Sequence, residues 1–475
     1  MVKIIFKFIL LIISVVLYGQ QKLNSNTIKK LYNEKFNFSK NQTTFLSKNN
    51  KNQFQITFNN KIYYNTNLPN LENQNGFYFP KGTGLISGFL FHYNGKYLKL
   101  TAEPQISGVF ENTYSLRHKE KLVSTLNNSA LKYFNRTKIN NFRNMGLAFQ
   151  YSGFSLGYAN WDQWWGPGIH NSIVMSNNAE GIPHYFVGTM NYQPLRGDLD
   201  YYFKYMVSDA MYNNAGTEYF LSAYYFNLRY KNIEVGKSRH ILNGGYNDLL
   251  WSLNDAINVF VTKKYMKYWD QIVDYYISVS FPSSGLKVFI EVGFPNRSFN
   301  GENIQIYSDH AMGTNLGLRK YGAFGKDEIL FGFEYTRLVQ GLHYNILPTP
   351  NWYDNIKYNY SSYNGRRWAA HSGSDSDDFL VFMGYMKDQF SFIYGLNYER
   401  HGVTYHFPPE VKIESRISVS FKYKNIFFYL NYENEHFEHY GFVDENRNVW
   451  EETFETGSIQ RTQTLLISVE HTFSF

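Results

Sequence analysis

Cysteine is absent from the 475 residues, and after the first nineteen residues no apolar run approaches the length of a membrane-spanning helix. The lack of cysteine excludes disulfides, thiolate metal sites and C-x-x-C redox motifs. A mean hydropathy of −0.42 gives no sign of a helical membrane protein either. H-E-x-x-H and G-x-x-x-x-G-K-[ST] motifs are missing, so we predict that the chain is not an enzyme and has no catalytic residue and no cofactor.

Aromatic residues, in contrast, are abundant. The chain contains 42 Tyr and 41 Phe, and aromatic residues make up 19% of the sequence. Alternation of apolar and polar residues hides hydrophobicity from a window average, because each lipid-facing residue is followed by a lumen-facing one. Transmembrane β-barrels have this weak signature, together with aromatic girdles at both membrane interfaces.

The first nineteen residues predict an exported protein. Lys3 and Lys7 precede an apolar stretch from Phe8 to Tyr18, and small Gly19 follows it. A basic start, a short apolar core and a small residue at the exit are typical of a secretory signal peptide. Its removal lowers the formal net charge from +7 to +5, because Lys3 and Lys7 leave with it. This mild, diffuse charge predicts no nucleic-acid partner.

The end of the chain predicts a barrel strand. One largely apolar face alternates with a mostly polar one and consists of Leu465, Ile467, Val469, His471, Phe473 and Phe475. A last strand with a terminal Phe resembles those of outer-membrane barrels, so Phe475 is the expected signal to the barrel-assembly machinery. Similar segments of about ten residues recur upstream. The predicted fold is an all-β transmembrane antiparallel β-barrel of 16 to 18 strands, 18 being preferred, with short helical or irregular periplasmic plug or cap segments.

The connections between strands predict an orientation. Because the last strand must end in the periplasm, the Lys387-Asp388 and Lys424-Asn425 turns belong there, and the long connections 339–375 and 436–459 face outside. The strand list places the similar Lys231-Asn232 turn outside, which is a conflict and leaves the strand count open.

The same pattern gives the domain boundaries. We predict a signal peptide at 1–19, an N-terminal periplasmic segment at 20–80 and an outer-membrane barrel at 81–475. Within the barrel, residues 111–144 contain leucines at helical spacing and are expected to form a periplasmic helical insertion. The expected location is the outer membrane of a Gram-negative-type bacterium, reached through the periplasm.

Two segments combine aromatic and polar side chains in the way that carbohydrate binding requires. Sugar rings stack on Trp and Tyr, and their hydroxyls need Asn, Asp, Gln and Arg partners. The first segment runs from Asn160 to Pro183, and the second surrounds Arg366. An interfacial belt is the alternative for the tryptophans of the first segment, since Trp161 follows a strand end. The run Gly373 to Asp378 bunches three carboxylates without EF-hand spacing, so a solvated loop is favoured and no metal site is predicted.

Both segments resemble the capsule-assembly Wzi family. The matching residues in the first are Gln163, Trp164, Trp165, Gly166, Pro167, Gly168, Ser172, Ile173, Ser176, Asn177, Asn178, Ala179 and Pro183. Those in the second are Gly365, Arg366, His371, Gly373, Asp375 and Asp377. The chain departs from the family at Ala370, where the family has Gly, and no family pattern occurs in 20–80.

The resemblance implies a barrel of about eighteen strands with helical material closing its periplasmic end. It also implies a surface lectin that helps attach or organise capsular polysaccharide. The expected partners are therefore capsular or other surface polysaccharide, outer-membrane lipid and the barrel-assembly machinery, and the protein is expected to be a monomer. A porin or specific transporter is the first alternative function, and a membrane-embedded enzyme is the second.

These considerations give a set of candidate glycan-binding residues, with Gly166, Pro167 and Gly168 as a structural turn. The candidates are Tyr363, Arg366, Arg367, Trp368, His371, Asp375, Asp377, Trp164, Trp165, Asn177 and Asn178.

Overall fold

The computed structural model describes residues 28, 31–32, 34–35, 53–68, 72–77, 79–109, 138–213, 215–245, 257, 259–260, 269–295, 312–339, 352–353, 355–364, 366–404, 409–440 and 459–475. Its strands are β1 (Gln53–Asn65), β2 (Gly82–Asn94), β3 (Leu98–Val109), β4 (Lys138–Tyr151), β5 (Phe154–Ala159), β6 (His184–Thr189), β7 (Gln193–Arg196), β8 (Leu199–Ser208), β9 (Met211–Tyr212), β10 (Glu218–Tyr230), β11 (Ile233–Gly244), β12 (Asp270–Phe281), β13 (Leu286–Pro295), β14 (Gly313–Tyr321), β15 (Ile329–Arg337), β16 (Ser362–Tyr363), β17 (Arg366–Arg367), β18 (Ser376–Lys387), β19 (Phe390–His401), β20 (Glu410–Tyr423), β21 (Ile426–Glu438) and β22 (Gln460–Ser474). Three short 3-10 helices are η3 (Pro282–Ser284), η5 (Ala323–Gly325) and η6 (Ile356–Ser361).

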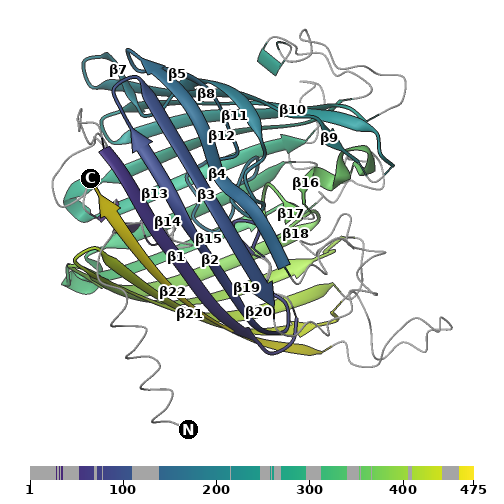
Figure 1. The fold of residues 1–475 in the computed structure, drawn as a ribbon. Coiled ribbons are helices and arrows are strands. Elements are labelled where there is room, and N and C mark those ends of the chain that lie inside the picture. The colour runs from purple at the N-terminus through teal and green to yellow at the C-terminus, as the bar shows by residue number, and fades with distance from the viewer. Residues whose placement is uncertain are drawn as a thin grey trace.

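The large strands close into an antiparallel β-barrel of 18 strands, as predicted. Each pairs with the next around the ring, and the last, β22, pairs with β1 over eleven partner positions from Gln55↔Ser474 to Asn65↔Thr464. Figure 1 shows the strands inclined around this ring, with the first and last lying side by side. The short strands β7 and β9 only extend its rim, and β16 and β17 form a separate hairpin.

Side chains alternate between the two faces of the wall, as in β19. Phe392, Leu396 and Tyr398 point outward and are 40%, 48% and 42% exposed. Between them, Asn397 and Glu399 face the lumen and are buried. An apolar outer face with a polar inner face is the arrangement of a barrel in a lipid bilayer.

The two ends of the barrel differ. At one end, here named the turn end, short connections at Lys231-Asn232, Asp388-Gln389 and Lys424-Asn425 join consecutive strands. The opposite end, the loop end, carries the long connections. Short turns are typical of the periplasmic side and long loops of the outer side. The expectation that the Lys231-Asn232 turn faces outward is therefore wrong. It had followed from a miscounted strand, since β11 leads directly to β12.

The predicted domain boundary at residue 80 is also wrong, because β1 lies within 20–80. Its outward face carries Phe54, Phe58 and Ile62, while Asn59 and Lys61 face the lumen and are buried. Residues 53–65 thus belong to the barrel wall and not to an extra-barrel segment.

The expected periplasmic insertion at 111–144 needs a correction as well. β4 begins at Lys138, and the connection from β3 to β4 lies at the loop end by strand order. Residues 110–137 and the predicted signal peptide lie outside the described residues. Helical residues near the N-terminus, which include Leu31 and Glu34, lie at the turn end, where Glu34 pairs with Arg319.

Among the described residues, no helix has the length and apolar character needed to cross a membrane.

Candidate functional site: a plug inside the barrel

The connection between β5 and β6 folds back into the barrel instead of staying on its rim. Every residue from 167 to 179 is buried, although the segment has no regular strand. Buried backbone N–H and C=O groups need hydrogen-bond partners, which is why connecting loops normally run over the surface. We name this segment, residues 160–183, the plug loop. Its hydrogen-bond partners explain its conformation.

Side chains of the barrel wall supply many of these partners. Glu334 on β15 accepts hydrogen bonds from the backbone N–H groups of Ile169, His170 and Asn171 at 2.8, 3.0 and 2.8 Å. Glu291 on β13 accepts another from the Ile173 N–H at 3.2 Å. Charge-assisted bonds of this kind compensate both a buried carboxylate and buried amides. The plug loop is thus docked by its backbone on two lumen-facing glutamates.

The Gly-Pro-Gly sequence allows the backbone to approach these carboxylates. Gly166 has φ +116°, a backbone conformation that residues with a side chain rarely adopt, and it lies against Glu291. A Cβ on Gly168 would lie 2.3 Å from the Asn171 carbonyl oxygen and 2.8 Å from Glu334. Both glycines are therefore needed for this close packing.

Trp161 and Trp165 of the plug loop face inward and do not form an interfacial belt. Trp165 is 2% exposed and stacks on Tyr225 of β10, with ring centroids 5.4 Å apart and an interplanar angle of 4°. The Tyr225 hydroxyl also accepts a hydrogen bond from the Gly166 N–H at 3.2 Å. Trp161 donates to the buried Thr101 hydroxyl at 2.6 Å. Trp161 and Trp165 thus bond to or pack against lumen-facing wall residues, whereas the Trp164 indole donates to the Gly168 carbonyl within the plug loop at 2.9 Å.

The second predicted segment packs directly on the plug loop. Its residues 366–378 are all buried, and Asp377, at 9% exposed, is the most accessible of the charged ones. The Ser176 N–H and hydroxyl donate to the carbonyls of Trp368 and Ala369 at 2.6 and 2.5 Å. The Asn178 amide donates to the Arg367 carbonyl at 2.9 Å. The structure therefore joins two segments that lie almost two hundred residues apart in the sequence.

A third segment, 72–77 between β1 and β2, completes the plug. The Asn73 N–H donates to the Asn178 side chain at 2.9 Å, and the Asn177 amide donates to the Asn75 side chain at 2.7 Å. Sequence reasoning missed this segment because it was assigned to the periplasm. Its Asn-Gln-Asn-Gly run offered only a turn signal.

Two histidines and one aspartate form a compact cluster where the plug meets the wall. His170 Nε2 and His371 Nε2 lie 3.1 and 3.2 Å from Asp378 Oδ2, and all three residues are buried. The Asn171 amide donates to the same oxygen at 2.7 Å. Burial lowers the pKa of His170, but the charge of Asp378 and its hydrogen bond outweigh burial and raise that pKa to about 9.

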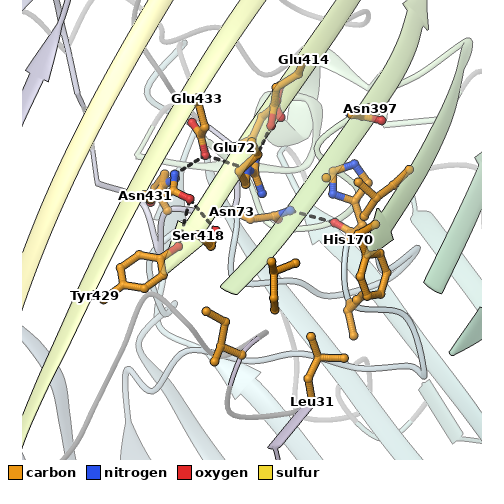
Figure 2. A pocket seen from close by; sticks show the side chains of 18 residues that line it. Leu31, Glu72, Asn73, His170, Asn397, Glu414, Ser418, Tyr429, Asn431 and Glu433 are labelled. Atoms are coloured by element: carbon orange, nitrogen blue, oxygen red, sulfur yellow. Dashed lines mark hydrogen bonds and ion pairs between the residues drawn. The ribbon is translucent and has the colours of Figure 1, made fainter. Parts of the chain in front are cut away.

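Beside this cluster lies a cavity of about 100 Å³. Figure 2 shows polar side chains on one side of it and Leu31 of the N-terminal segment on the other. Asn397 is 3% exposed, and its amide nitrogen and oxygen have no hydrogen-bond partner among the described residues. The cavity thus lies in the lumen between the plug and the N-terminal segment.

The candidate glycan-binding residues are mostly buried within this plug. Arg366 and Arg367 are 1% and 3% exposed, and Arg367 lies over the Tyr353 ring with its guanidinium 5.0 Å from the centroid. Burial lowers the pKa of Arg367 to about 10. Only Trp164 and Tyr363 are half-buried. The remaining candidates are buried and are Trp165, Trp368, His371, Asp375, Asp377, Asn177 and Asn178.

One pattern that resembles a catalytic motif has no such role. Gly153 to Gly157 spells G-x-S-x-G, which in hydrolases places a serine on a strand-to-helix turn. Here Ser155 lies within β5, and its hydroxyl donates to the Gly188 carbonyl of the neighbouring β6 at 3.1 Å. It is a wall residue in an extended strand.

Comparison with known proteins agrees with this architecture. No protein-family model matches the chain, and no curated protein sequence matches it. Among solved structures, it is similar to Wzi, an outer-membrane protein involved in group 1 capsule assembly in Escherichia coli and a carbohydrate-binding β-barrel. The TM-score is 0.61 at 12% identity, over 94% of this chain and 89% of Wzi. The chain has the fold of an outer-membrane β-barrel.

Two further similar structures are also barrels. Acinetobacter baumannii OccAB2 gives a TM-score of 0.48 at 10% identity, over 90% of this chain and 98% of its own. Pseudomonas aeruginosa OpdK, solved with vanillate, gives 0.47 at 8% identity, over 90% and 99%. At such identities the likeness concerns the fold alone.

Proposed function

We propose that this chain is a plugged outer-membrane barrel of the capsule-assembly Wzi family, which binds surface polysaccharide and helps attach or organise it at the cell surface. The observation that carries the proposal is the meeting of the two family-like segments. They lie far apart in the sequence, yet their backbones bond to each other and fill the lumen at the loop end. The likeness of the fold to a carbohydrate-binding barrel supports the same function.

Burial divides the candidate residues into two groups with different roles. Trp164 and Tyr363 are half-buried and offer aromatic surface on which a sugar ring can stack. Arg366, Arg367 and Trp368 are buried and hold the plug in shape. The glycan is therefore expected to contact the aromatic rim first, while the arginines act through the conformation of the plug.

The remaining partners follow from the outer surface. Lipid contacts the apolar outer face of the strands, where large side chains such as Phe149 and Leu156 are exposed. Phe475 is 74% exposed at the turn end and is the proposed signal to the barrel-assembly machinery. We propose a monomer that is exported through the periplasm.

Binding of the producing cell's own polysaccharide tests this function. Purified protein should retain that polysaccharide, and Tyr363→Ala should weaken retention. Stacking on one aromatic side chain contributes about 0.5–1.5 kcal/mol beyond burial, so the expected loss in affinity is roughly 2- to 10-fold. Phe324→Ala is the matched control, because Phe324 is an aromatic side chain, 81% exposed at the turn end.

Two results would contradict the proposal. One is that a variant carrying both Tyr363→Ala and Trp164→Ala retains as much polysaccharide as the control variant Phe324→Ala. The other is normal surface retention of polysaccharide in a strain from which the gene has been deleted.

A solute channel is the second candidate, and the charged lumen favours it. Lys412 of β20 lies 2.8 Å from Glu414 and 3.4 Å from Glu435, and Arg416 lies 2.8 Å from Glu433. Rows of lumen-facing charges are typical of selective pores. Planar-bilayer conductance separates the two functions, because a plugged binding barrel should pass little current and a channel should pass a steady one.

A further inference from the structure

A buried network of charged side chains surrounds the His-Asp cluster. Among the described residues, ion pairs connect seven carboxylates with two permanent cations and three histidines. The carboxylates are Glu72, Asp378, Glu399, Glu410, Glu414, Glu433 and Glu435, the cations are Lys412 and Arg416, and the histidines are His170, His371 and His401. Buried charges require compensation, and a bound cation is one way to supply it.

The positions of the ligand atoms indicate where a cation would fit. His170, His371 and Asp378 each offer one atom, and these atoms lie within 4.8 Å of one another. Four ligands about 2.0–2.1 Å from a tetrahedral ion are separated by about 3.3–3.4 Å. The observed separations of 3.1 and 3.2 Å between Asp378 Oδ2 and the two Nε2 atoms are close to this value.

The direction of one imidazole points to the same conclusion. His371 Nε2 is 3.2 Å from Asp378 Oδ2, yet by geometry it has no hydrogen-bond partner in the part of the chain that the structure describes. A nitrogen that is close to an oxygen but not aimed at it is oriented as in a metal site, where both atoms point to a shared centre. Glu72 Oε2, at 3.7 Å from the same nitrogen, is within reach as a further ligand.

We propose that His170, His371 and Asp378 bind one divalent transition-metal ion of the zinc type, which fastens the plug to the barrel wall. The three ligands come from the plug loop, the second segment and β18, so one ion would join all three parts. Two imidazole ligands favour zinc-type ions over calcium, which prefers six to eight oxygen ligands. The proposal is independent of carbohydrate binding.

The surroundings of the cluster support a metal site. The Asn171 amide donates to Asp378 at 2.7 Å and orients the carboxylate, as outer-shell partners do in metal sites. His170 and Glu72 both line the cavity beneath the plug, which gives an ion a path to the cluster. Asn73 lies 3.2 Å from His371 Nδ1, and its Oδ1 has no hydrogen-bond partner among the described residues. A half-turn of that amide would let Oδ1 accept from a protonated Nδ1, with loss of its bond to the His170 carbonyl.

Metal content of the purified chain tests the site. The full chain, carrying a tag without histidine, is purified in detergent, stripped with a chelator, dialysed against zinc and measured by elemental mass spectrometry. The expected result is one zinc per chain. Cobalt, used in place of zinc, should give the visible absorption of a low-symmetry, four- or five-coordinate site, and calcium should not compete.

Variants with matched controls assign the ligands. Asp378→Asn and His371→Gln should each weaken zinc binding by more than the roughly 10- to 100-fold that loss of an outer-shell partner costs. Asp377→Asn and His401→Gln are the controls, since Asp377 pairs with Arg400 and His401 pairs with Glu399 and Glu410. Heat-modifiable mobility on a gel verifies that each variant still forms the folded barrel.

Two results would overturn the proposal. In the first, wild-type protein retains no zinc, and the cluster is then a hydrogen-bonded His-Asp-His network. In the second, folded Asp378→Asn and His371→Gln bind zinc as tightly as the controls. Either result would leave the polysaccharide measurements unaffected.

Discussion

The barrel wall and the plug satisfy the hydrogen bonds of their buried backbone in different ways. In the wall, each strand pairs with its neighbours, so side chains are free to alternate between lipid and lumen. In the plug loop, residues 167–179 are buried without strand partners, and wall side chains such as Glu334 take over that role. The comparison teaches that the lumen face of the wall is shaped to dock a particular backbone.

The largest expected effect comes from removing the main apolar contact between plug and wall. Trp165→Ala deletes a buried ring stacked on Tyr225 and should weaken docking of the plug loop by about 3–5 kcal/mol. Limited proteolysis should then cut within 160–183 while the barrel stays folded. Trp164→Phe, at a half-buried position, is the control. Unchanged resistance of Trp165→Ala to protease would show that the plug does not depend on this contact.

A charge on the lipid face should damage the wall and leave the plug intact. Leu396 lies mid-way along β19 and is 48% exposed on the outer face, so Leu396→Arg should destabilise the barrel by about 2–4 kcal/mol. Phe390→Arg at the turn end of the same strand should cost less, because the penalty falls towards the interface. Urea unfolding in lipid measures both. Equal costs at the two positions would contradict the assigned membrane depth.

A smaller effect is expected from changing the chemistry of docking without changing its shape. Glu334→Gln replaces one acceptor oxygen by an N–H₂ group, which then faces either the N–H of Ile169 or those of His170 and Asn171. An unsatisfied buried donor costs about 1–3 kcal/mol, and we expect a loss of docking of this size. Glu438→Gln, on the exposed end of β21, is the control. Proteolysis of the plug loop at an unaltered rate would argue against docking by Glu334.

The smallest effect belongs to the rim of the plug. Asp377→Asn removes an ion pair with Arg400, whose side chain is 36% exposed, and exposed pairs contribute about 0–1 kcal/mol. Unfolding and proteolysis should both stay close to wild type. A loss as large as that of Glu334→Gln would show that the plug is held from its rim as much as from the wall.

The wall was predictable from the sequence because its signal is local. Alternation and a terminal aromatic strand identified the barrel and favoured eighteen strands. The sequence did not predict β1 as a strand because its lumen face carries Gln55, Asn59 and Lys61, which are residue types common in solvated segments. The Lys231-Asn232 turn was assigned to the wrong end of the barrel because one miscounted strand reverses the end at which every earlier connection is placed.

The sequence identified two segments of the plug, but it did not predict that they assemble inside the barrel. Trp165 and Arg366 were singled out from residue types, and their burial was not foreseen because it depends on distant wall residues. Nothing near Ile169 in the sequence indicates that its N–H bonds to Glu334. The approach of His170 to His371 likewise follows only from the closed barrel.

Amide hydrogen exchange of the plug loop tests the central claim most directly. The claim is that this segment is docked in the lumen by its backbone. We predict that the amides of Ile169, His170 and Asn171 exchange as slowly as those in the middle of β19, because Glu334 accepts a hydrogen bond from each. Exchange as fast as that of the exposed Asp388-Gln389 turn would contradict the claim.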